Sequence, residues 1–561
     1  MKVIIIGGVA GGAAAAARLR RLSEQAEILL LERGGYISFA NCGLPYYIGG
    51  EIKDKEDLTL QTPESFRKRF HIDVRIFHEA IKIDPERKTV RIQDKKSGEE
   101  YTESYDKLIL SPGAEPIRPP IPGTDSDRIF TLRSIPDTLK IKAYIEKAKP
   151  RSAVIVGGGY IGVEMAENLQ KAGLDVTIAE LSDHVIAPLD SDMAADVHRY
   201  LKTQGIRLLL GQAVREIRDG RDAPLQIVLD FQTLSADMVL LCAGVRPETG
   251  LAVDCGITCG ARGCILTDRR MQTNYPDIYA VGDAVQVRDF TTGAPAFIPL
   301  AGPAAKEGRI AADNICGLDS EYEGTQGSSV LKLFDMTIAT TGANERTAAA
   351  ARIDYDKTYL YSASHASYYP GAASMSIKAL WEKDSQRLLG AQIVGFDGVD
   401  KRMDVLAAAI RLGAKVIDLA AFELCYAPPY GSAKDPVNMI GFVAENVITG
   451  KVKQFFWHDV NALPRDGSVT LLDVRTEAEA GRGRIDGFQN IPLDTLRERL
   501  SELPKDKPIY VHCHSGLRSY IACRILTGYG YDCYNLAGGF RLYESVMHEK
   551  AVPDVSCLTG K

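Results

Sequence analysis

The sequence contains two copies of one pattern, in which an apolar run leads into a glycine-rich turn, a helix and a second apolar run that ends in glutamate. In the first copy, residues 3–6 precede a turn that starts at Gly7 and ends at Gly12, and Glu32 closes the next apolar run. Val9 stands where a middle glycine is expected, so this copy is partial. Such a turn presents backbone N–H groups and a helix N-terminus to a pyrophosphate. The acid can bind a ribose hydroxyl, so this copy predicts a Rossmann-like dinucleotide-binding domain.

The second copy carries the full G-x-G-x-x-G spacing. Residues 153–156 lead into Gly157, Gly159 and Gly162, and Glu180 ends the following strand. A carboxylate at that position accepts hydrogen bonds from a free 2′-hydroxyl and repels a 2′-phosphate. We therefore expect a second dinucleotide site that prefers NADH to NADPH.

Length and composition limit the remaining possibilities. At 561 residues, the chain is long enough for three or four domains. The net charge of −6 does not favour nucleic acid or a basic membrane surface as a partner. No apolar run reaches the ~18 residues of a membrane span, and the short opening run does not resemble an export signal. We expect a cytoplasmic protein whose eleven scattered cysteines are thiols.

Cys42 is the only cysteine in the first 241 residues. It lies in the stretch 38–47, Ser-Phe-Ala-Asn-Cys-Gly-Leu-Pro-Tyr-Tyr, which offers no second thiol nearby. The alternative interpretation is a buried small hydrophobe, although the surrounding Gly and Pro indicate a turn. Sulfur chemistry here would use one protein thiol and a sulfur from the substrate. The cluster Cys255, Cys259 and Cys264 matches no metal-binding spacing, so we predict no metal site.

Three further segments, 108–113, 240–244 and 273–283, are strands that end in small-residue turns or in an acid. With them, about 440 residues resemble the flavoprotein disulfide reductases that have two dinucleotide-binding domains. The resemblance implies FAD on Gly7, Gly12, Glu32, Gly113 and Asp283, and NADH on Gly157, Gly159, Gly162 and Glu180. It predicts an FAD-binding domain in two parts (1–150 and 266–324), an NAD(H)-binding domain (151–265) and an α+β dimerisation domain (325–450).

Two loops rich in Tyr and Pro, 365–371 and 426–434, narrow the resemblance to the coenzyme A-disulfide reductase branch. They could also be simply well-packed turns. The resemblance implies that Tyr368 and Tyr426 reach the active site of the partner subunit in a homodimer. It also implies that Lys434 contacts the ligand and that a coenzyme A channel is lined by Ala14, Arg18, Arg21, Ser38 and Asn41. Arg18 and Arg21 could instead form an ordinary solvated helix face.

The neighbouring branch comprises NADH oxidases and peroxidases, which cycle one cysteine through a sulfenic acid. Those enzymes typically carry a histidine in the first phosphate loop, where this chain has Ala10. The substitution argues against peroxide as the main substrate.

After residue 451 a new strand and helix pattern begins. A strand at 508–512 leads to Cys513, and a helix is predicted from Tyr520 to Thr527. Inward-facing N–H groups and the positive end of a helix favour a thiolate at such a junction. Arg518 follows the cysteine by five residues, whereas cysteine phosphatases place it at six. The segment resembles a rhodanese, so we predict a C-terminal α/β rhodanese domain over residues 455–561.

Together these features predict an NADH-dependent flavoprotein that reduces coenzyme A disulfide, coenzyme A persulfide or polysulfide through Cys42. Cys513 would bind and transfer sulfane sulfur, with Arg518 in the substrate loop and coenzyme A as substrate or carrier. The alternatives are an NADH oxidase or peroxidase with an accessory domain, and a flavin-containing sulfur carrier or redox sensor.

Overall fold

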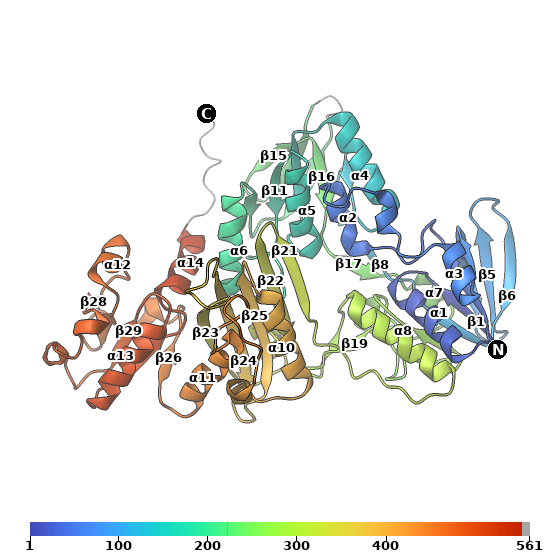
Figure 1. The fold of residues 1–561 in the computed structure, drawn as a ribbon. Coiled ribbons are helices and arrows are strands. Elements are labelled where there is room, and N and C mark those ends of the chain that lie inside the picture. The colour runs from blue at the N-terminus through green and yellow to red at the C-terminus, as the bar shows by residue number, and fades with distance from the viewer. Residues whose placement is uncertain (221–222, 552–561) are drawn as a thin grey trace. The chain divides into compact units, whose positions relative to one another are not determined.

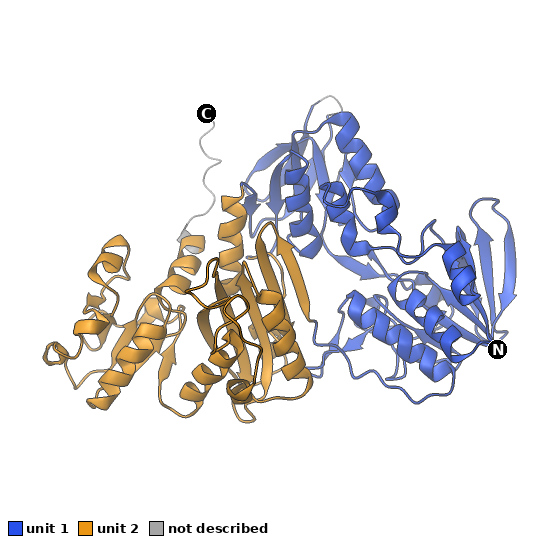
Figure 2. Cartoon of the chain, viewed as in Figure 1, with its two compact units in different colours: residues 1–183, 205–327 blue, residues 184–204, 328–561 orange. Residues whose placement is uncertain are grey.

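The computed structural model describes residues 1–220 and 223–551, so the last ten residues of the predicted rhodanese domain lie outside the described part of the chain. The chain divides into two compact units (Figure 2). Unit 1 comprises residues 1–183 and 205–327, and unit 2 comprises residues 184–204 and 328–561. No helix in the described part of the chain is long and apolar enough to cross a membrane.

The first sheet of unit 1 is parallel and has the strand order β18-β7-β1-β2-β3. Strand β1 is labelled beside the N-terminus in Figure 1. Its strands are β1 (Lys2–Ile6), β2 (Glu27–Glu32), β3 (Asp73–Ile76), β7 (Lys107–Leu110) and β18 (Ile278–Ala280). Val3, Ile4 and Ile5 are fully buried, as a parallel strand covered on both faces requires. Helices α1 (Ala10–Leu22) and α8 (Ala301–Ile315) pack together although about 290 residues separate them. Segments from both ends of unit 1 therefore build one domain.

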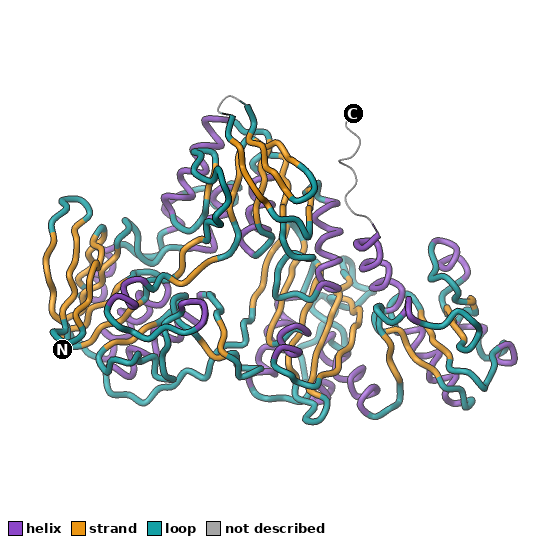
Figure 3. Tube along the Cα trace, turned by 180° about the vertical axis from the view of Figure 1, so that it is seen from behind, coloured by secondary structure: helices purple, strands orange, loops and turns teal. Residues whose placement is uncertain are grey.

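Three antiparallel strands extend this domain and form the orange ladder above the N-terminus in Figure 3. They are β4 (His78–Asp84), β5 (Thr89–Asp94) and β6 (Glu100–Ser104). The remaining short elements of the domain are α2 (Leu44–Ile48), α3 (Pro63–Phe70), α7 (Gly250–Asp254), β19 (Val287–Arg288) and β20 (Pro295–Ala296).

The second sheet of unit 1 is also parallel, with the order β12-β11-β10-β16-β9. Its strands are β9 (Ile129–Phe130), β10 (Ser152–Val156), β11 (Asp175–Ala179), β12 (Arg207–Leu209) and β16 (Met238–Leu241). The same region contains the helices α4 (Ile135–Ala148) and α5 (Tyr160–Lys171). It also contains two smaller antiparallel sheets, one of β13 (Val214–Arg218), β14 (Leu225–Leu229) and β15 (Thr233–Ala236), the other of β8 (Ala114–Pro116) and β17 (Val245–Pro247). Strand β9 precedes residue 151, so this sheet takes an edge strand from before the expected start of its domain.

Unit 2 begins with an antiparallel sheet of order β21-β22-β25-β24-β23, which confirms the predicted α+β class of this region. Its strands are β21 (Ser329–Leu333), β22 (Met336–Gly342), β23 (Tyr355–Ala363), β24 (Ser374–Glu382) and β25 (Leu388–Gly395). The helices of this region are α6 (Ser191–Thr203), α9 (Glu345–Ala350), α10 (Val399–Arg411) and α11 (Pro436–Ile448). Helix α6 lies within the predicted NAD(H) segment, yet its contacts group it with unit 2.

The C-terminal module of unit 2 is a parallel sheet of order β26-β30-β29-β27-β28. Its strands are β26 (Lys453–Phe455), β27 (Thr470–Asp473), β28 (Gln489–Asn490), β29 (Ile509–His512) and β30 (Cys533–Leu536). Its helices are α12 (Glu477–Arg482), α13 (Leu517–Gly528) and α14 (Gly539–Ala551). The predicted helix from Tyr520 is confirmed as α13 but begins three residues earlier, directly after the cysteine loop.

Candidate active sites

Cys42 is a free, exposed cysteine in a short 3₁₀ turn, Asn41–Gly43, that runs into α2. The backbone N–H of Ser38 donates to the carbonyl of Gly8 at 2.8 Å, and the N–H of Ala40 donates to Leu58 O at 2.8 Å. The first of these bonds fixes the cysteine segment to the first glycine-rich turn. A single thiol therefore lies beside a dinucleotide-type turn.

The surroundings of Cys42 disfavour its thiolate. Although solvent reaches Cys42, the protein atoms packed around the thiol partly desolvate it and raise its pKa. The carboxylates of Glu164 and Asp283 raise this pKa further. Glu164 lies on α5, two residues after the last fingerprint glycine, and the hydroxyl of Tyr46 donates to it at 3.3 Å. Burial raises the pKa of Glu164 to about 7. Neither Glu164 nor Tyr46 was identified from the sequence.

The first turn has the shape of a dinucleotide cradle. Gly7 has a φ of +99°, and a Cβ there would lie 2.0 Å from Ser111 O. A Cβ on Gly12 would lie 1.9 Å from Gly7 O, so only glycine fits at both positions. The Glu32 carboxylate accepts from Gly8 N at 3.0 Å and from Gly34 N at 2.8 Å. No side chain caps the N-terminus of α1, which leaves its N–H groups available to a phosphate.

Two acids lie near the end of the edge strand β18: Asp283 follows the strand, and Glu307 comes from α8. Burial raises the pKa of Asp283, the predicted FAD ligand. The N–H of Gly282 donates to Glu307 Oε2 at 2.7 Å, and burial raises the pKa of Glu307 to about 7. Glu307 was not identified from the sequence, because it lies on α8 without a recognisable motif. Gly113, with a φ of +79°, ends the neighbouring β7 turn. These residues fit FAD, because the polar groups of a bound FAD could form hydrogen bonds with the acids at this edge of the sheet.

The second turn repeats the geometry. A Cβ on Gly157 would lie 2.3 Å from Cys242 O, and one on Gly162 would lie 2.1 Å from Gly157 O. Gly159 faces open space and caps α5 without a side-chain bond. The Glu180 carboxylate accepts from Gly158 N at 2.5 Å and from Ser182 N at 2.7 Å. The residues fit a pyrophosphate at α5 and a ribose at Glu180.

Helix α1 presents Ala14, Arg18 and Arg21 at i, i+4 and i+7, which is one face of the helix. Arg18 Nε donates to Asp313 Oδ1 of α8 at 2.6 Å, and Arg21 is exposed. Arg20 is buried and donates to four backbone carbonyls, so it stabilises the fold. Asn41 is exposed and Ser38 half-buried.

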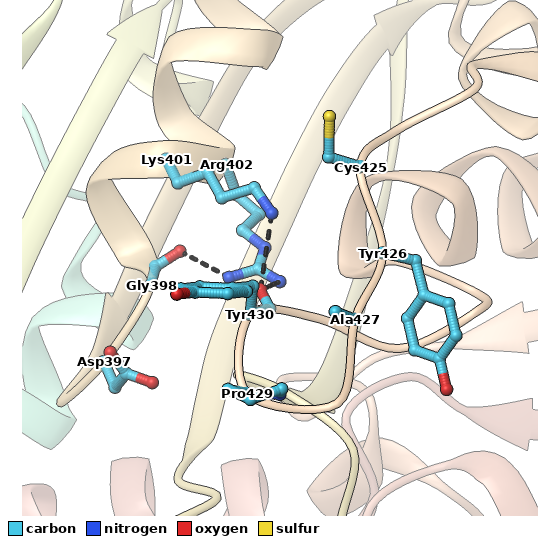
Figure 4. A pocket seen from close by; sticks show the side chains of 9 residues that line it. All are labelled: Asp397, Gly398, Lys401, Arg402, Cys425, Tyr426, Ala427, Pro429 and Tyr430. Atoms are coloured by element: carbon cyan, nitrogen blue, oxygen red, sulfur yellow. Dashed lines mark hydrogen bonds between the residues drawn. The ribbon is translucent and has the colours of Figure 1, made fainter.

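In unit 2 the structure brings together two tyrosines that are 58 residues apart in the sequence. The hydroxyls of Tyr368 and Tyr426 lie 2.9 Å apart, and both side chains are exposed. Tyr426 borders a cavity of about 450 Å³ (Figure 4). Lys434 lies exposed in the following segment.

A buried arginine on α10 holds the two tyrosine loops. Arg402 pairs with Asp435 at 2.9 Å and donates to the carbonyls of Ser364 and Tyr430 at 2.8 and 3.4 Å. Ser364 directly precedes the loop 365–371, and Tyr430 lies inside the loop 426–434. Arg402 has no sequence motif and was missed.

The C-terminal module positions a second thiol. Cys513 follows β29, is fully buried, and accepts from Gly516 N at 3.1 Å and from Ser519 Oγ at 3.3 Å. Gly516, with a φ of +96°, starts α13. The turn before α14 covers the loop, since a Cβ on Gly539 would lie 2.7 Å from Gly516 N. The predicted loop geometry is thus present.

Charged neighbours surround this loop. Arg518 Nη2 and Nη1 bind the two oxygens of Glu479 at 2.6 and 2.7 Å. Arg475 pairs with Asp473 at 2.7 Å in the core. Burial lowers the pKa of His512 to about 4, so this histidine is neutral at pH 7. Glu479 was also missed, because it lies 39 residues from its partner.

Comparisons with known proteins agree with this geometry. Coenzyme A disulfide reductase of Staphylococcus epidermidis is 36% identical over 445 residues, which cover 79% of this chain and 100% of the relative. The crystal structure of reduced Bacillus anthracis CoADR-RHD superposes with a TM-score of 0.96 at 49% identity and covers 98% of both chains. A NAD-dependent persulfide reductase from A. fulgidus gives 0.90 at 37% identity, with 97% of this chain and 100% of that chain covered. Water-forming NADH oxidase from Lactobacillus brevis gives 0.77 at 30% identity and covers 80% of this chain and 99% of that chain.

Family models match nearly the whole length. The pyridine nucleotide-disulphide oxidoreductase model matches residues 1–307, and the dimerisation domain of that family matches residues 328–436. A rhodanese-like domain matches residues 457–545. The chain therefore belongs to the pyridine nucleotide-disulphide oxidoreductase family and carries a C-terminal rhodanese-like domain.

Proposed function

We propose that the protein is an NADH-dependent FAD enzyme that reduces coenzyme A disulfide, coenzyme A persulfide or polysulfide. The observation that carries the proposal is a free thiol, Cys42, in a segment whose Ser38 N–H donates to Gly8 O of a dinucleotide turn. A thiol with no resolving cysteine beside it requires the second sulfur to come from the substrate.

The site residues divide the work. Gly7, Gly12, Glu32, Gly113 and Asp283 would hold FAD, and Gly157, Gly159, Gly162 and Glu180 would hold NADH. FAD, when bound, carries the hydride equivalent of NADH to sulfur. The Cys42 thiolate attacks the outer sulfur of a persulfide, whose S–S bond breaks and leaves the coenzyme A thiolate. Two electrons then release the sulfur from Cys42 as hydrogen sulfide and restore the thiolate.

Other residues would bind coenzyme A or donate a proton to the leaving thiolate. Ala14, Arg18, Arg21, Ser38, Asn41 and Lys434 would line the path of coenzyme A. The hydrogen-bonded hydroxyls of Tyr368 and Tyr426 would donate a proton to the leaving thiolate across a homodimer interface. Cys513 would accept sulfane sulfur as a persulfide, with Arg518 in its loop. The free thiols of the described residues agree with a cytoplasmic location.

The NADH oxidase alternative has weaker support. The oxidase superposes on 80% of this chain, whereas the two reductases cover 98% and 97%, including the C-terminal module. NADH consumption with oxygen should be far slower than with coenzyme A disulfide or persulfide. A faster reaction with oxygen would favour the oxidase.

The main test is Cys42→Ser. We expect this variant to lose turnover of coenzyme A disulfide and persulfide while keeping bound flavin, measured by NADH oxidation and flavin absorbance. Cys316→Ser, which changes a half-buried thiol elsewhere in unit 1, is the matched control and should remain active. Full activity in Cys42→Ser would reject the proposal.

The division of labour is tested with Cys513→Ser. This variant should keep coenzyme A disulfide reduction and lose polysulfide use, because only the second reaction requires sulfane transfer. Cys523→Ala, which changes a thiol in the core of the same module, should keep both reactions. An equal loss of both reactions in Cys513→Ser would contradict separate roles.

A further inference from the structure

The arginine of the Cys513 loop is occupied by a carboxylate of its own module. Arg518 and Glu479 form two parallel hydrogen bonds of 2.6 and 2.7 Å, and each side chain is about a third exposed, at 33% and 32%. The Glu479 carboxylate also accepts from the backbone N–H and the hydroxyl of Thr476, at 3.0 and 2.9 Å, as the third residue of a capping box. Four bonds therefore fix this carboxylate beside the loop.

The pair remains ionised at neutral pH. The hydrogen bonds from Arg518 lower the pKa of Glu479 to about 2. The hydrogen bonds to Glu479 raise the pKa of Arg518, and Cys513 raises it further. Arg518 is the second residue of α13 and directly follows the Cys513 loop. A sulfur donor that approaches Cys513 therefore meets an arginine whose two terminal nitrogens are already bonded to Glu479 and whose charge that carboxylate neutralises.

We propose that Glu479 selects the sulfur donor of Cys513, by favouring organic persulfides and excluding thiosulfate. The inference rests on the proposed role of Cys513 as an acceptor of sulfane sulfur. It deepens that role by naming the donor class and the residue that sets it.

The two donors differ in the charge next to the transferred sulfur. Thiosulfate carries a sulfonate there, and its transfer releases sulfite while the persulfide forms on Cys513. That group needs a free cationic fork, which arginine supplies in bidentate form. Here Arg518 is occupied by Glu479, and Arg475 is occupied by Asp473. A third arginine beside the loop, Arg541, is also engaged, because it donates to Ser374 Oγ at 3.0 Å and lies over the Tyr361 ring.

An organic persulfide does not need a free arginine, because it carries no sulfonate. The Cys513 thiolate attacks its outer sulfur, the S–S bond breaks, and the electron pair leaves on the carbon-bound thiolate, which takes a proton from water. No oxyanion forms in this step, so the Glu479 carboxylate does not oppose it.

The surface next to the loop suits a carbon chain. Leu517 and Ile521 lie at i and i+4 on the first turns of α13, and they are 58% and 39% exposed. Leu517 is the residue directly before Arg518. Exposed apolar side chains at this position can pack against the carbon part of a donor, whereas thiosulfate has none.

The test compares two donors in the full-length protein, with cyanide as acceptor and thiocyanate as the measured product. Glu479→Gln removes the charge, and glutamine still serves in a capping box. We expect kcat/KM for thiosulfate to rise about tenfold, as expected for one charged contact. The rate with N-acetylcysteamine persulfide should change less than about twofold. Glu477→Gln, on an exposed position of the same helix, is the charge-matched control and should leave both rates unchanged.

A second variant separates charge from packing. Glu479→Asp keeps the charge but shortens the reach to Arg518, so it should still disfavour thiosulfate. The inference is overturned if Glu479→Gln leaves the ratio of the two donors unchanged. It is also overturned if the wild type uses thiosulfate as well as the persulfide. Failure of the underlying proposal looks different, because the wild type would then form thiocyanate from either donor no faster than the uncatalysed reaction with cyanide.

Discussion

Glu164 shows how a single half-buried carboxylate can control a neighbouring thiol. Its pKa is raised to about 7 by burial, and its ionised form raises the pKa of Cys42. Below about pH 7, Glu164 is protonated and this electrostatic effect is absent. Above that pH, the carboxylate opposes formation of the thiolate on which the proposed chemistry depends.

Replacing this acid should therefore change the titration of the thiol. In Glu164→Gln, we expect the pKa of Cys42 to fall, because a negative charge near the thiol is removed. The measurement is the pH dependence of Cys42 alkylation by iodoacetamide in the flavin-loaded protein. Glu146→Gln, at an exposed position of α4, should leave the profile unchanged. An unchanged profile in Glu164→Gln would show that Glu164 does not act on Cys42.

The residues predicted from the sequence share one property. The glycines, Glu32, Glu180 and the candidate cysteines Cys42 and Cys513 lie in short local motifs, where spacing alone indicates a phosphate turn or a thiol loop. Glu164, Arg402 and Glu479 could not be predicted in this way. Their partners lie 118, 33 and 39 residues away, so only the folded chain brings them together.

At the scale of elements, α6 illustrates what sequence patterns miss. The buried strands β1 and β10 were predicted because continuous apolar runs mark parallel strands. Helix α6 is polar at its start, and its Asp192 is buried against β23 and β24 of unit 2. That position depends on buried ion pairs, which have no sequence signature.

Lys378 on β24 is the cation of this cluster. It is fully buried and pairs with Asp190, Asp192 and Glu345 at 2.7, 3.0 and 2.5 Å. Burial would raise the pKa of Glu345, but Lys378 and Lys357 lower it to about 2. The three carboxylates could hold a metal ion by spacing, yet the ammonium already lies among them.

Removing this ammonium should be costly. Lys378→Met leaves three carboxylates without their buried partner, so we expect a loss of about 3–5 kcal/mol in the free energy of unfolding. Chemical denaturation measures the change. Lys306→Met, at an exposed position of α8, should cost less than about 0.5 kcal/mol. Similar losses in both variants would contradict a stabilising role for the cluster.

At the scale of the whole molecule, the proposed homodimer is the feature with the largest consequence. Tyr368 and Tyr426 lie together and exposed, on loops held by Arg402. If they complete the active site of a second copy, each site takes Cys42 from one subunit and the tyrosines from the other.

Mixed dimers test this arrangement. A subunit with Cys42→Ser and a subunit with Tyr368→Phe and Tyr426→Phe should both be poorly active alone. Co-expressed with two different affinity tags and purified as heterodimers, they should regain about half of the wild-type activity, because one of two sites is intact. Heterodimers without recovered activity would show that the tyrosines do not act across subunits.

The final helix α14 connects the Cys513 loop to the rest of unit 2. At its start, Phe540 N and Arg541 N donate to the carbonyls of Cys513 and His514 at 2.8 and 2.9 Å. Near its end, Ser545 and Glu549 bind Asp196 and Lys202 of α6 at 2.8 and 3.0 Å. Helix α14 therefore binds the Cys513 loop at its start and helix α6 further along its length. If sulfane sulfur passes from Cys513 to Cys42 as proposed, a small diffusible thiol such as coenzyme A would carry it in place of a moving protein segment.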